Sequence, residues 1–176
     1  MKYLDAQNAP FAVIVSNTDE VDTATVTVTL PDGNQISEAV GPESLHIFNL
    51  PADWGIEGSG LTQNAFHIES THPIVTHQFN PLHNVDVFSN DASVLLPVDM
   101  MGSEYYVVTL EHFDAGSQEF PGYLNIVGIA GEPVEVTVTV STSTWSWLPP
   151  PVVSETLQPP APRPDARGYF ARDRTP

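Results

Sequence analysis

Alternation of valine with polar residues is the feature that most limits how this chain can fold. It occurs at Thr23–Leu30 (TATVTVTL) and at Val134–Ser141 (VEVTVTVS). Successive side chains of a β-strand point to opposite faces, so this spacing favours strands with one apolar and one polar face. Valine and threonine also have branched side chains that suit strands. No stretch of twelve residues combines helical spacing with capping residues.

Further short apolar runs recur about every ten residues, with turn-forming residues between them. One of the turns is Pro31–Asn34 (PDGN). Such regular short strands are typical of an antiparallel sandwich, so the predicted fold class is all-β, antiparallel and β-sandwich-like. The other expected strands are Phe11–Val15, Ile36–Val40, Leu45–Leu50, Ala65–Ser70, Ile74–Phe79, Ser93–Pro97, Tyr105–Leu110 and Tyr123–Ala130.

A weak internal repeat indicates two related β units. Segments 11–30 and 123–142 each contain an apolar strand led by an aromatic residue, an acidic turn and an alternating strand. An apolar strand follows the first copy but not the second, so we predict that the second unit is incomplete. The predicted organisation is a lead-in at 1–10, a first β unit at 11–121, the start of a second β unit at 122–158, and a disordered tail rich in proline and arginine at 159–176.

The composition of residues 159–176 differs from that of the rest of the chain. All four arginines lie here, at positions 163, 167, 172 and 174. Proline removes backbone hydrogen-bond donors, so no strand is expected in this segment. Two interpretations stay open, an ordinary proline-rich terminus and a truncated or frameshifted end. A truncated sheet would have an open edge, and we would then expect self-association through that edge.

The rest of the chain is strongly acidic. There is no lysine or arginine between Tyr3 and Pro162, and the formal net charge of the whole chain is -17. Binding to nucleic acid or to an anionic membrane surface requires clustered basic residues, so both are excluded as partners. Cations, neutral glycans and neutral or basic proteins remain as partner classes.

Other absences narrow the class of protein further. The chain has no cysteine, which excludes a disulfide scaffold, a cysteine-ligated zinc site and thiol chemistry. No run of eighteen apolar residues is present, so membrane insertion is not expected. The first residues, MKYLDAQNAP, contain no apolar stretch, and no signal peptide is visible in this chain.

A family resemblance rests on six motifs in a fixed order. They are FAVIVSN at 11–17, LxIFNLP at 45–51, IxSxxPIV at 68–75, QFNP at 78–81, SNDASxLLP at 89–97 and GxEYYV at 102–107. Together they make the chain resemble the N-terminal domain family of IgGFc-binding proteins, in the form found in bacterial, especially myxobacterial, surface proteins. The resemblance implies an all-β adhesive module at the cell surface or outside the cell. It carries over no catalytic residue, and it suggests a fragment of a larger surface protein.

Five aromatic residues are candidates for contact with a protein or glycan ligand at the cell surface. Aromatic rings provide large apolar faces with a polar atom at one end, which suits binding platforms as well as core packing. Within an alternating strand only one of two consecutive tyrosines can face the core, so the other is expected to be exposed. The five candidates are Trp54, Tyr105, Tyr106, Trp145 and Trp147.

An oxygen-rich segment makes calcium the best-supported ligand among the metal ions, and no other cofactor is expected. Calcium prefers carboxylate and amide oxygens that converge from loops. The candidate ligands are Asn84, Asp86, Asn90 and Asp91. The alternative is that these side chains form turns and bond to the backbone at the start of the strand expected at Ser93–Pro97.

Catalysis is not expected. The chain has no GxSxG nucleophile motif, and nothing in the sequence brings two carboxylates such as Glu104 and Glu111 together. The sequence therefore predicts a non-catalytic binding or adhesion module. A calcium-stabilised carbohydrate-binding module and a secreted hydrolase are the alternatives.

Overall fold

The computed structural model describes residues 10–56, 60–83, 90–108, 113–115, 118–120, 124–129, 134–139, 152–157 and 170–171. The chain divides into two compact units. The first unit contains residues 1–127 and 167–176, and the second contains residues 128–166. The segment 167–176 thus belongs to the same unit as the first strands of the chain.

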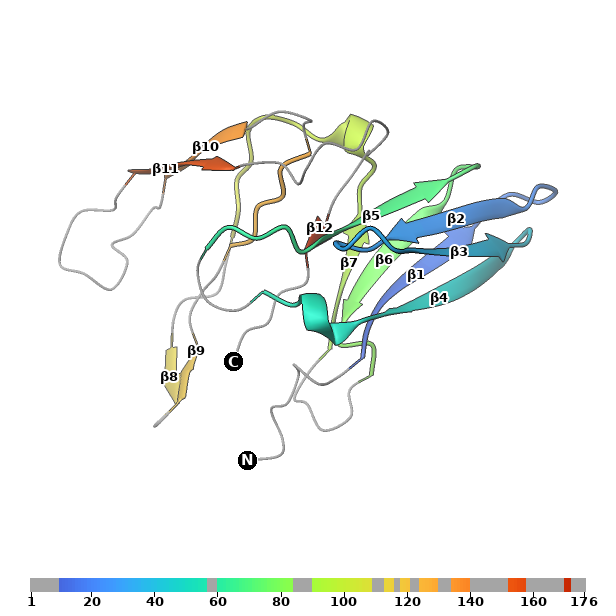
Figure 1. Cartoon of the computed structure of the whole chain (residues 1–176), viewed down its shortest axis with the longest axis horizontal. Coiled ribbons are helices and arrows are strands. Elements are labelled where there is room, and N and C mark those ends of the chain that lie inside the picture. The colour runs from blue at the N-terminus through green and yellow to red at the C-terminus, as the bar shows by residue number, and fades with distance from the viewer. Residues whose placement is uncertain are drawn as a thin grey trace. The chain divides into compact units, whose positions relative to one another are not determined.

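The first unit contains two four-stranded antiparallel sheets (Figure 1). The order in the first sheet is β4 (Ser44–Leu50), β1 (Phe11–Asn17), β6 (Val75–Asn80) and β7 (Asp91–Leu95). The order in the second sheet is β12 (Phe170–Ala171), β5 (Ala65–Ser70), β2 (Ala24–Thr29) and β3 (Gln35–Val40). The chain passes from one sheet to the other after β1, β3, β4 and β5. The predicted all-β, antiparallel sandwich-like fold is confirmed.

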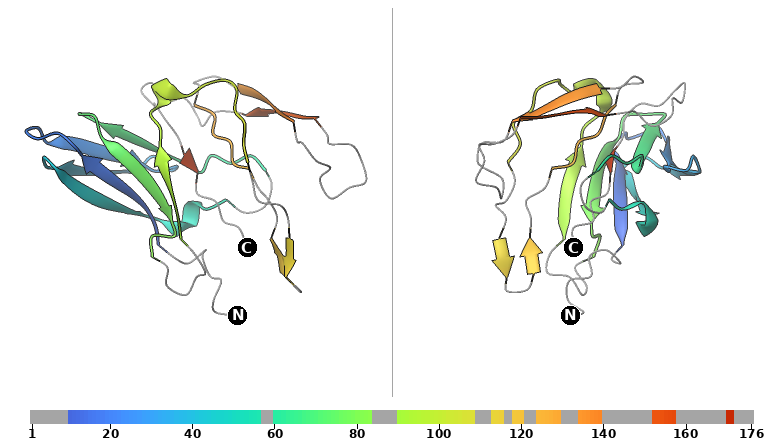
Figure 2. Two further views of the ribbon diagram at one scale, coloured as in Figure 1. Left: turned by 180° about the vertical axis from the view of Figure 1, so that it is seen from behind. Right: turned by 60° about the vertical axis from the view of Figure 1, so that its left-hand side comes forward.

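The core of the first unit is formed by alternate residues of strands from both sheets. On β2 the buried valines are Val26 and Val28, as the alternation predicts. Phe11 of β1 and Phe66 of β5 are both fully buried, and their ring centroids lie 6.0 Å apart. Because β1 and β5 belong to different sheets, this ring pair joins the two layers. Figure 2 shows the strands of both sheets as ribbons from two further directions.

The predicted turn at Pro31–Asn34 connects β2 to β3. The Leu30 carbonyl accepts the Gly33 N–H at 2.9 Å, and the Leu30 N–H donates to the Asn34 carbonyl at 2.8 Å. Gly33 has a φ of 95°, a left-handed conformation that favours glycine. Asp32 Oδ1 accepts the Asn34 N–H at 2.9 Å. The turn sets the register in which Thr27 pairs with Ser37.

A buried asparagine connects the loops at the other end of β2. Asn17 is only 2% exposed. Its Nδ2 donates to the carbonyl oxygens of Asp22, Val40 and Gly41 at 2.8, 3.0 and 3.1 Å. Its Oδ1 accepts the Asp19 N–H at 3.0 Å. The last residue of β1 thereby ties the β1–β2 loop to the end of β3.

The carboxylate of Asp19, a half-buried residue, organises the same loop. Its Oδ1 accepts the N–H groups of Val21 and Asp22, both at 2.8 Å. These bonds, first that from Asp22 and then that from Val21, stabilise the charged form and lower the pKa of Asp19 below its usual value of 3.8. The loop is therefore closed by an ionised carboxylate at neutral pH.

Shorter elements complete the described part of the chain. In the first unit they are the 3-10 helices η1 (Ala52–Trp54) and η2 (Val98–Met100) and the hairpin of β8 (Phe113–Ala115) with β9 (Gln118–Phe120). In the second unit, β10 (Val134–Thr139) pairs antiparallel with β11 (Val152–Leu157). The second alternating strand is thus confirmed, and its valines at 136 and 138 are half-buried while the residues between them are exposed.

Three expectations about strands are wrong. Residues 105–108 and 124–129 are not strands, although strands were predicted at Tyr105–Leu110 and Tyr123–Ala130. Alternating apolar residues form a strand only where a neighbour accepts and donates the backbone hydrogen bonds, and no described strand pairs with either segment. Conversely, Phe170–Ala171 form β12 within the tail, where no strand was expected. This is compatible with the sequence because residues 165–175 contain no proline.

Candidate binding surfaces

In the part of the chain that the structure describes, a run of exposed apolar side chains begins in the edge strand β7. We call residues 94–108 the apolar segment. It begins in β7, passes through η2 and continues through residues that belong to no helix or strand. Tyr106 and Val108 are 95% and 96% exposed. Its other exposed large apolar side chains are Val94, Leu96, Met100, Met101, Tyr105 and Val107.

The two consecutive tyrosines of the apolar segment differ in how they are held. The Tyr105 hydroxyl accepts the Gly102 N–H at 2.7 Å and donates toward Met101 Sδ at 3.7 Å. Tyr105 is therefore anchored to the turn that follows η2. The expectation that one of the two tyrosines would face the core is wrong, because residues 104–108 are not part of a sheet and both rings are exposed.

Only acidic residues carry charge along the apolar segment and at its start. Asp91, Asp99 and Glu104 are all exposed. The sequence from 90 to 108 contains no lysine, arginine or histidine. A ligand that covers the apolar side chains would therefore meet negative charge at their margin, which favours a neutral or basic partner.

The three tryptophan candidates are not part of this surface in the described structure. Trp54 lies in η1, is half-buried and packs against the core cluster. It therefore contributes to the core packing that the sequence also allowed. Trp145 and Trp147 lie outside the described residues, so their predicted role in binding stays a prediction.

The proposed calcium ligands are described only in part. Asn90 and Asp91 are exposed, and Asp91 Oδ1 accepts the Ala92 N–H at 2.8 Å at the start of β7. This is the kind of bond to the backbone that the alternative interpretation expected. Asn84 and Asp86 lie outside the described residues. Within the described ranges, no three histidine, aspartate or glutamate side chains are grouped so that they could hold a metal ion.

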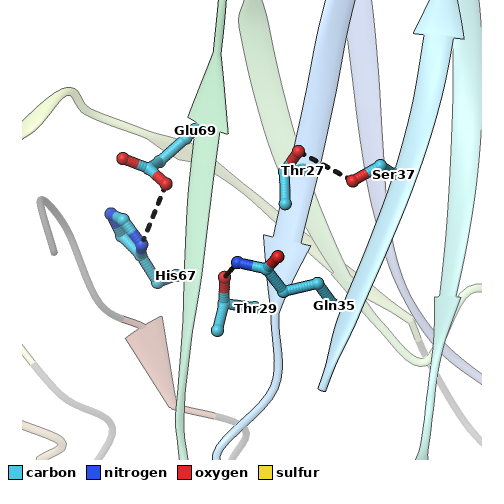
Figure 3. Close-up of polar contacts among 6 residues, drawn as sticks. All are labelled: Thr27, Thr29, Gln35, Ser37, His67 and Glu69. Carbon is cyan, nitrogen blue, oxygen red and sulfur yellow. Dashed lines mark hydrogen bonds and ion pairs between the residues drawn. The ribbon is translucent and has the colours of Figure 1, made fainter. Parts of the chain in front are cut away.

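A second surface, the polar outer face of the second sheet, was indicated only indirectly by the sequence. Thr27 and Ser37 hydroxyls lie 2.8 Å apart, Gln35 Nε2 donates to Thr29 Oγ1 at 3.1 Å, and His67 Nδ1 lies 3.8 Å from Glu69 Oε2 (Figure 3). Strand register places these side chains in two rows across β3, β2 and β5. One row is Ser37–Thr27–Glu69, and the other is Gln35–Thr29–His67.

The alternation at Thr23–Leu30 predicts that its threonines lie on a polar face, but it does not say which residues lie beside them. Those neighbours depend on the pairing of β2 with β3 and β5, and β5 lies about forty residues further along the chain. His67 is 5% exposed although it lies in one of the rows. On β5, the polar face is therefore covered at His67, while Glu69 two residues further along the strand stays partly exposed.

Comparisons of this chain with protein-family models, curated proteins and solved structures found no match. In the part of the chain that the structure describes, no helix has the length and apolar character needed to cross a membrane.

Proposed function

We propose that the chain is a non-catalytic binding or adhesion module of an extracellular or cell-surface protein, and that it holds its ligand through the apolar segment. The observation that carries the proposal is the exposure of Tyr106 and Val108 beside the anchored Tyr105. Contiguous apolar side chains on a soluble protein commonly mark an interaction site, and tyrosine is enriched where such sites are buried by a partner.

The family resemblance supports the same location. Two of its motifs, SNDASxLLP at 89–97 and GxEYYV at 102–107, cover most of the apolar segment. Residues that characterise the resemblance thus coincide with residues that the fold leaves exposed. A role in core packing would not account for this coincidence, since every residue from 99 to 108 is exposed.

The charge of the chain defines the class of ligand. With a formal net charge of -17 and exposed acidic residues at 91, 99 and 104, the module would repel acidic partners. A neutral glycan that stacks on the tyrosine rings, or a protein with an apolar and basic surface, fits these properties. We favour the protein ligand, because the exposed aliphatic residues in the apolar segment outnumber the tyrosines.

A binding screen with matched variants tests the proposal. Immobilised neutral oligosaccharides and a panel of neutral and basic proteins would be probed with the chain, and each signal would be measured again with Tyr106→Ala and Val108→Ser. Val21→Ser is the control, because Val21 is also highly exposed, at 79%, but lies in the β1–β2 loop. We expect Tyr106→Ala to lose roughly tenfold or more in affinity, as is common for an aromatic residue at the centre of an interface, and Val108→Ser to lose less.

Three other results would contradict the proposal. If every ligand found binds both variants as tightly as the control, the apolar segment is not the contact surface. If a ligand is found whose binding requires calcium, the calcium-stabilised carbohydrate-binding module replaces the present proposal. Turnover of a glycan or ester by the chain, lost on changing one carboxylate, would establish the hydrolase instead.

A further inference from the structure

The edge strand β7 ends the first sheet, and no described strand pairs with its outer side. Its residues Asp91, Ala92, Ser93 and Val94 are all exposed. β7 contains neither proline nor lysine, and its only charged residue is Asp91 at its start. Sheets commonly protect such an edge with lysine, proline or a covering element, because unpaired backbone groups attract another strand. β7 therefore offers an edge to which an extended chain can add.

The backbone N–H and C=O groups of Ala92 and Val94 point toward this open edge. Asp91 Oδ1 accepts the Ala92 N–H at 2.8 Å, so the ladder between β6 and β7 does not use this donor. Alternate residues of a strand direct their backbone groups to the same side, and Val94 therefore shares the direction of Ala92.

The bonding of the neighbouring strands leads to the same result. The carbonyl of Pro10, just before β1, accepts the N–H of Leu82, just after β6, at 2.6 Å. Even-numbered residues of β1 therefore direct their backbone groups toward β6, where their partners include His77 and Phe79. Because these two residues of β6 bond to β1, the residues opposite them in β7 direct their own groups outward.

The side chains of Ala92 and Val94 lie on the outer face of the first sheet, which is largely apolar. Strand register gives two rows across this face, Ile47–Ile14–His77–Val94 and Asn49–Ala12–Phe79–Ala92. Neither row contains an aspartate, glutamate, lysine or arginine, although the chain has 22 acidic residues, so this face lacks the charge found elsewhere on the chain. A strand added to β7 extends both rows, and apolar side chains opposite Ala92 and Val94 suit it best.

Asp91 and Ser93 lie on the opposite face of β7 and suit polar neighbours. Opposite charges across a strand pair are favourable, so a lysine or arginine fits opposite Asp91. A second copy of β7 does not supply it, because symmetric antiparallel pairing centred on Ser93 places Leu95 opposite Asp91. Two copies also repel each other, since each has a formal net charge of -17. The residue pattern therefore favours a different partner.

We propose that the open edge of β7 binds an extended strand of a neutral or basic protein ligand by adding that strand to the first sheet. Main-chain bonds supply the affinity, and alternate side chains supply the specificity. The ligand's lysine or arginine pairs with the Asp91 carboxylate, which releases the Ala92 N–H to the ligand strand. This inference rests on the proposed function, because it names the form of the protein ligand whose contact surface begins at Val94.

A designed peptide tests the proposal on the full chain. The probe is a fluorescent, end-capped peptide of sequence KVTVTVK, which puts valines opposite Ala92 and Val94 and a lysine opposite Asp91. The control peptide has the same sequence with N-methylated interior residues, so it keeps the charge but cannot donate to the edge. Ala92→Pro blocks the edge, and proline is tolerated where an edge N–H faces solvent. Asn49→Pro is the matched control, because Asn49 ends the same row on the other edge strand, β4.

We expect fluorescence anisotropy to show that KVTVTVK binds the wild-type chain and that the N-methylated peptide does not. Ala92→Pro should lose roughly tenfold or more in affinity, because it removes an edge donor and its ring keeps the incoming strand away. Asn49→Pro should bind like wild type. If Ala92→Pro fails to fold, Asp91→Lys tests the register, because it should lose affinity for KVTVTVK and gain affinity for the peptide EVTVTVE.

Several results would overturn the proposal. Failure of KVTVTVK to bind, or equal binding of both peptides, would show that backbone pairing is not the mode of recognition. An equal loss in Ala92→Pro and Asn49→Pro would show that β7 is not the specific edge. Self-association of the wild-type chain that Ala92→Pro abolishes would make a second copy the occupant.

Failure of this inference is distinguishable from failure of the proposed function. Tyr106→Ala changes no residue of β7. If that variant weakens a ligand from the screen while KVTVTVK does not bind, only the inference about the edge is wrong. If KVTVTVK binds at the edge while every screened ligand tolerates Tyr106→Ala, only the proposed contact surface is wrong.

Discussion

Replacing Asn17 with alanine should destabilise the first unit by about 3 kcal/mol. The Asn17 amide has two hydrogens shared among the three carbonyl oxygens of Asp22, Val40 and Gly41. Two donated bonds are worth about 1 kcal/mol each, and the Val40 carbonyl, which is buried, adds about 1 kcal/mol when it loses its donor. The expected loss of stability therefore combines two lost hydrogen bonds with the cost of leaving the buried Val40 carbonyl oxygen without a donor.

Urea unfolding followed by tryptophan fluorescence measures this loss. With a slope of about 2 kcal/mol per molar, the transition midpoint should fall by about 1.5 M. Asn34→Ala is the matched control, because Asn34 is also an asparagine bonded in a loop but is exposed. Its effect should be about 0.5 kcal/mol or less.

A second substitution separates the hydrogen bonds from simple packing. Asn17→Asp keeps the size of the side chain but replaces the donating amide with a carboxylate that faces three carbonyl oxygens. At neutral pH it should destabilise the protein at least as much as Asn17→Ala does. A loss of under about 1 kcal/mol for Asn17→Ala, or a stable Asn17→Asp variant, would refute the reasoning, because buried acceptors would then not depend on this donor.

Two further predictions concern acid and calcium. The lowered pKa of Asp19 means that its stabilising effect is complete above the usual value of 3.8 and is lost as the pH falls through the lower folded-state value. The stability difference between wild type and Asp19→Asn should therefore shrink as the pH is lowered from 5 to 2, and a constant difference would contradict it. For calcium, we expect the same thermal midpoint in chelator and in millimolar calcium, since a ligand raises the midpoint only if it binds the folded state. If calcium raises the thermal midpoint and Asp91→Ala abolishes that rise, the predicted calcium site would be supported instead.

The fold class was predictable because period-two patterning is a local property. The alternation of threonine and valine at Thr23–Leu30 predicts a strand, and it shows which residues share a face of that strand, without any knowledge of the strands that pair with it. The PDGN sequence at Pro31–Asn34 likewise determines its turn and the β2–β3 hairpin. Both features can be predicted from a few consecutive residues of the sequence.

Features that depend on pairing over long distances were not predictable in the same way. Residues 105–108 have the pattern of a strand but no described partner, so both tyrosines are exposed instead of one. Phe170–Ala171 lie in a tail whose prolines argued against any strand, yet they pair with the first two residues of β5. In both places the outcome depends on which backbone lies alongside, and the composition of a single segment does not contain that information.

The pairing of β12 with β5 also affects the order of events during synthesis. Phe66 and Phe170 are separated by about a hundred residues, and translation at roughly 5–20 residues per second covers that distance in roughly 5–20 s. Throughout that interval the nascent chain can already contain β1 to β7 while the final strand of the second sheet does not yet exist. The first unit can therefore reach its finished form only after the second unit has been translated, so a slow or stalled ribosome would prolong the time during which β5 is open to neighbouring nascent chains.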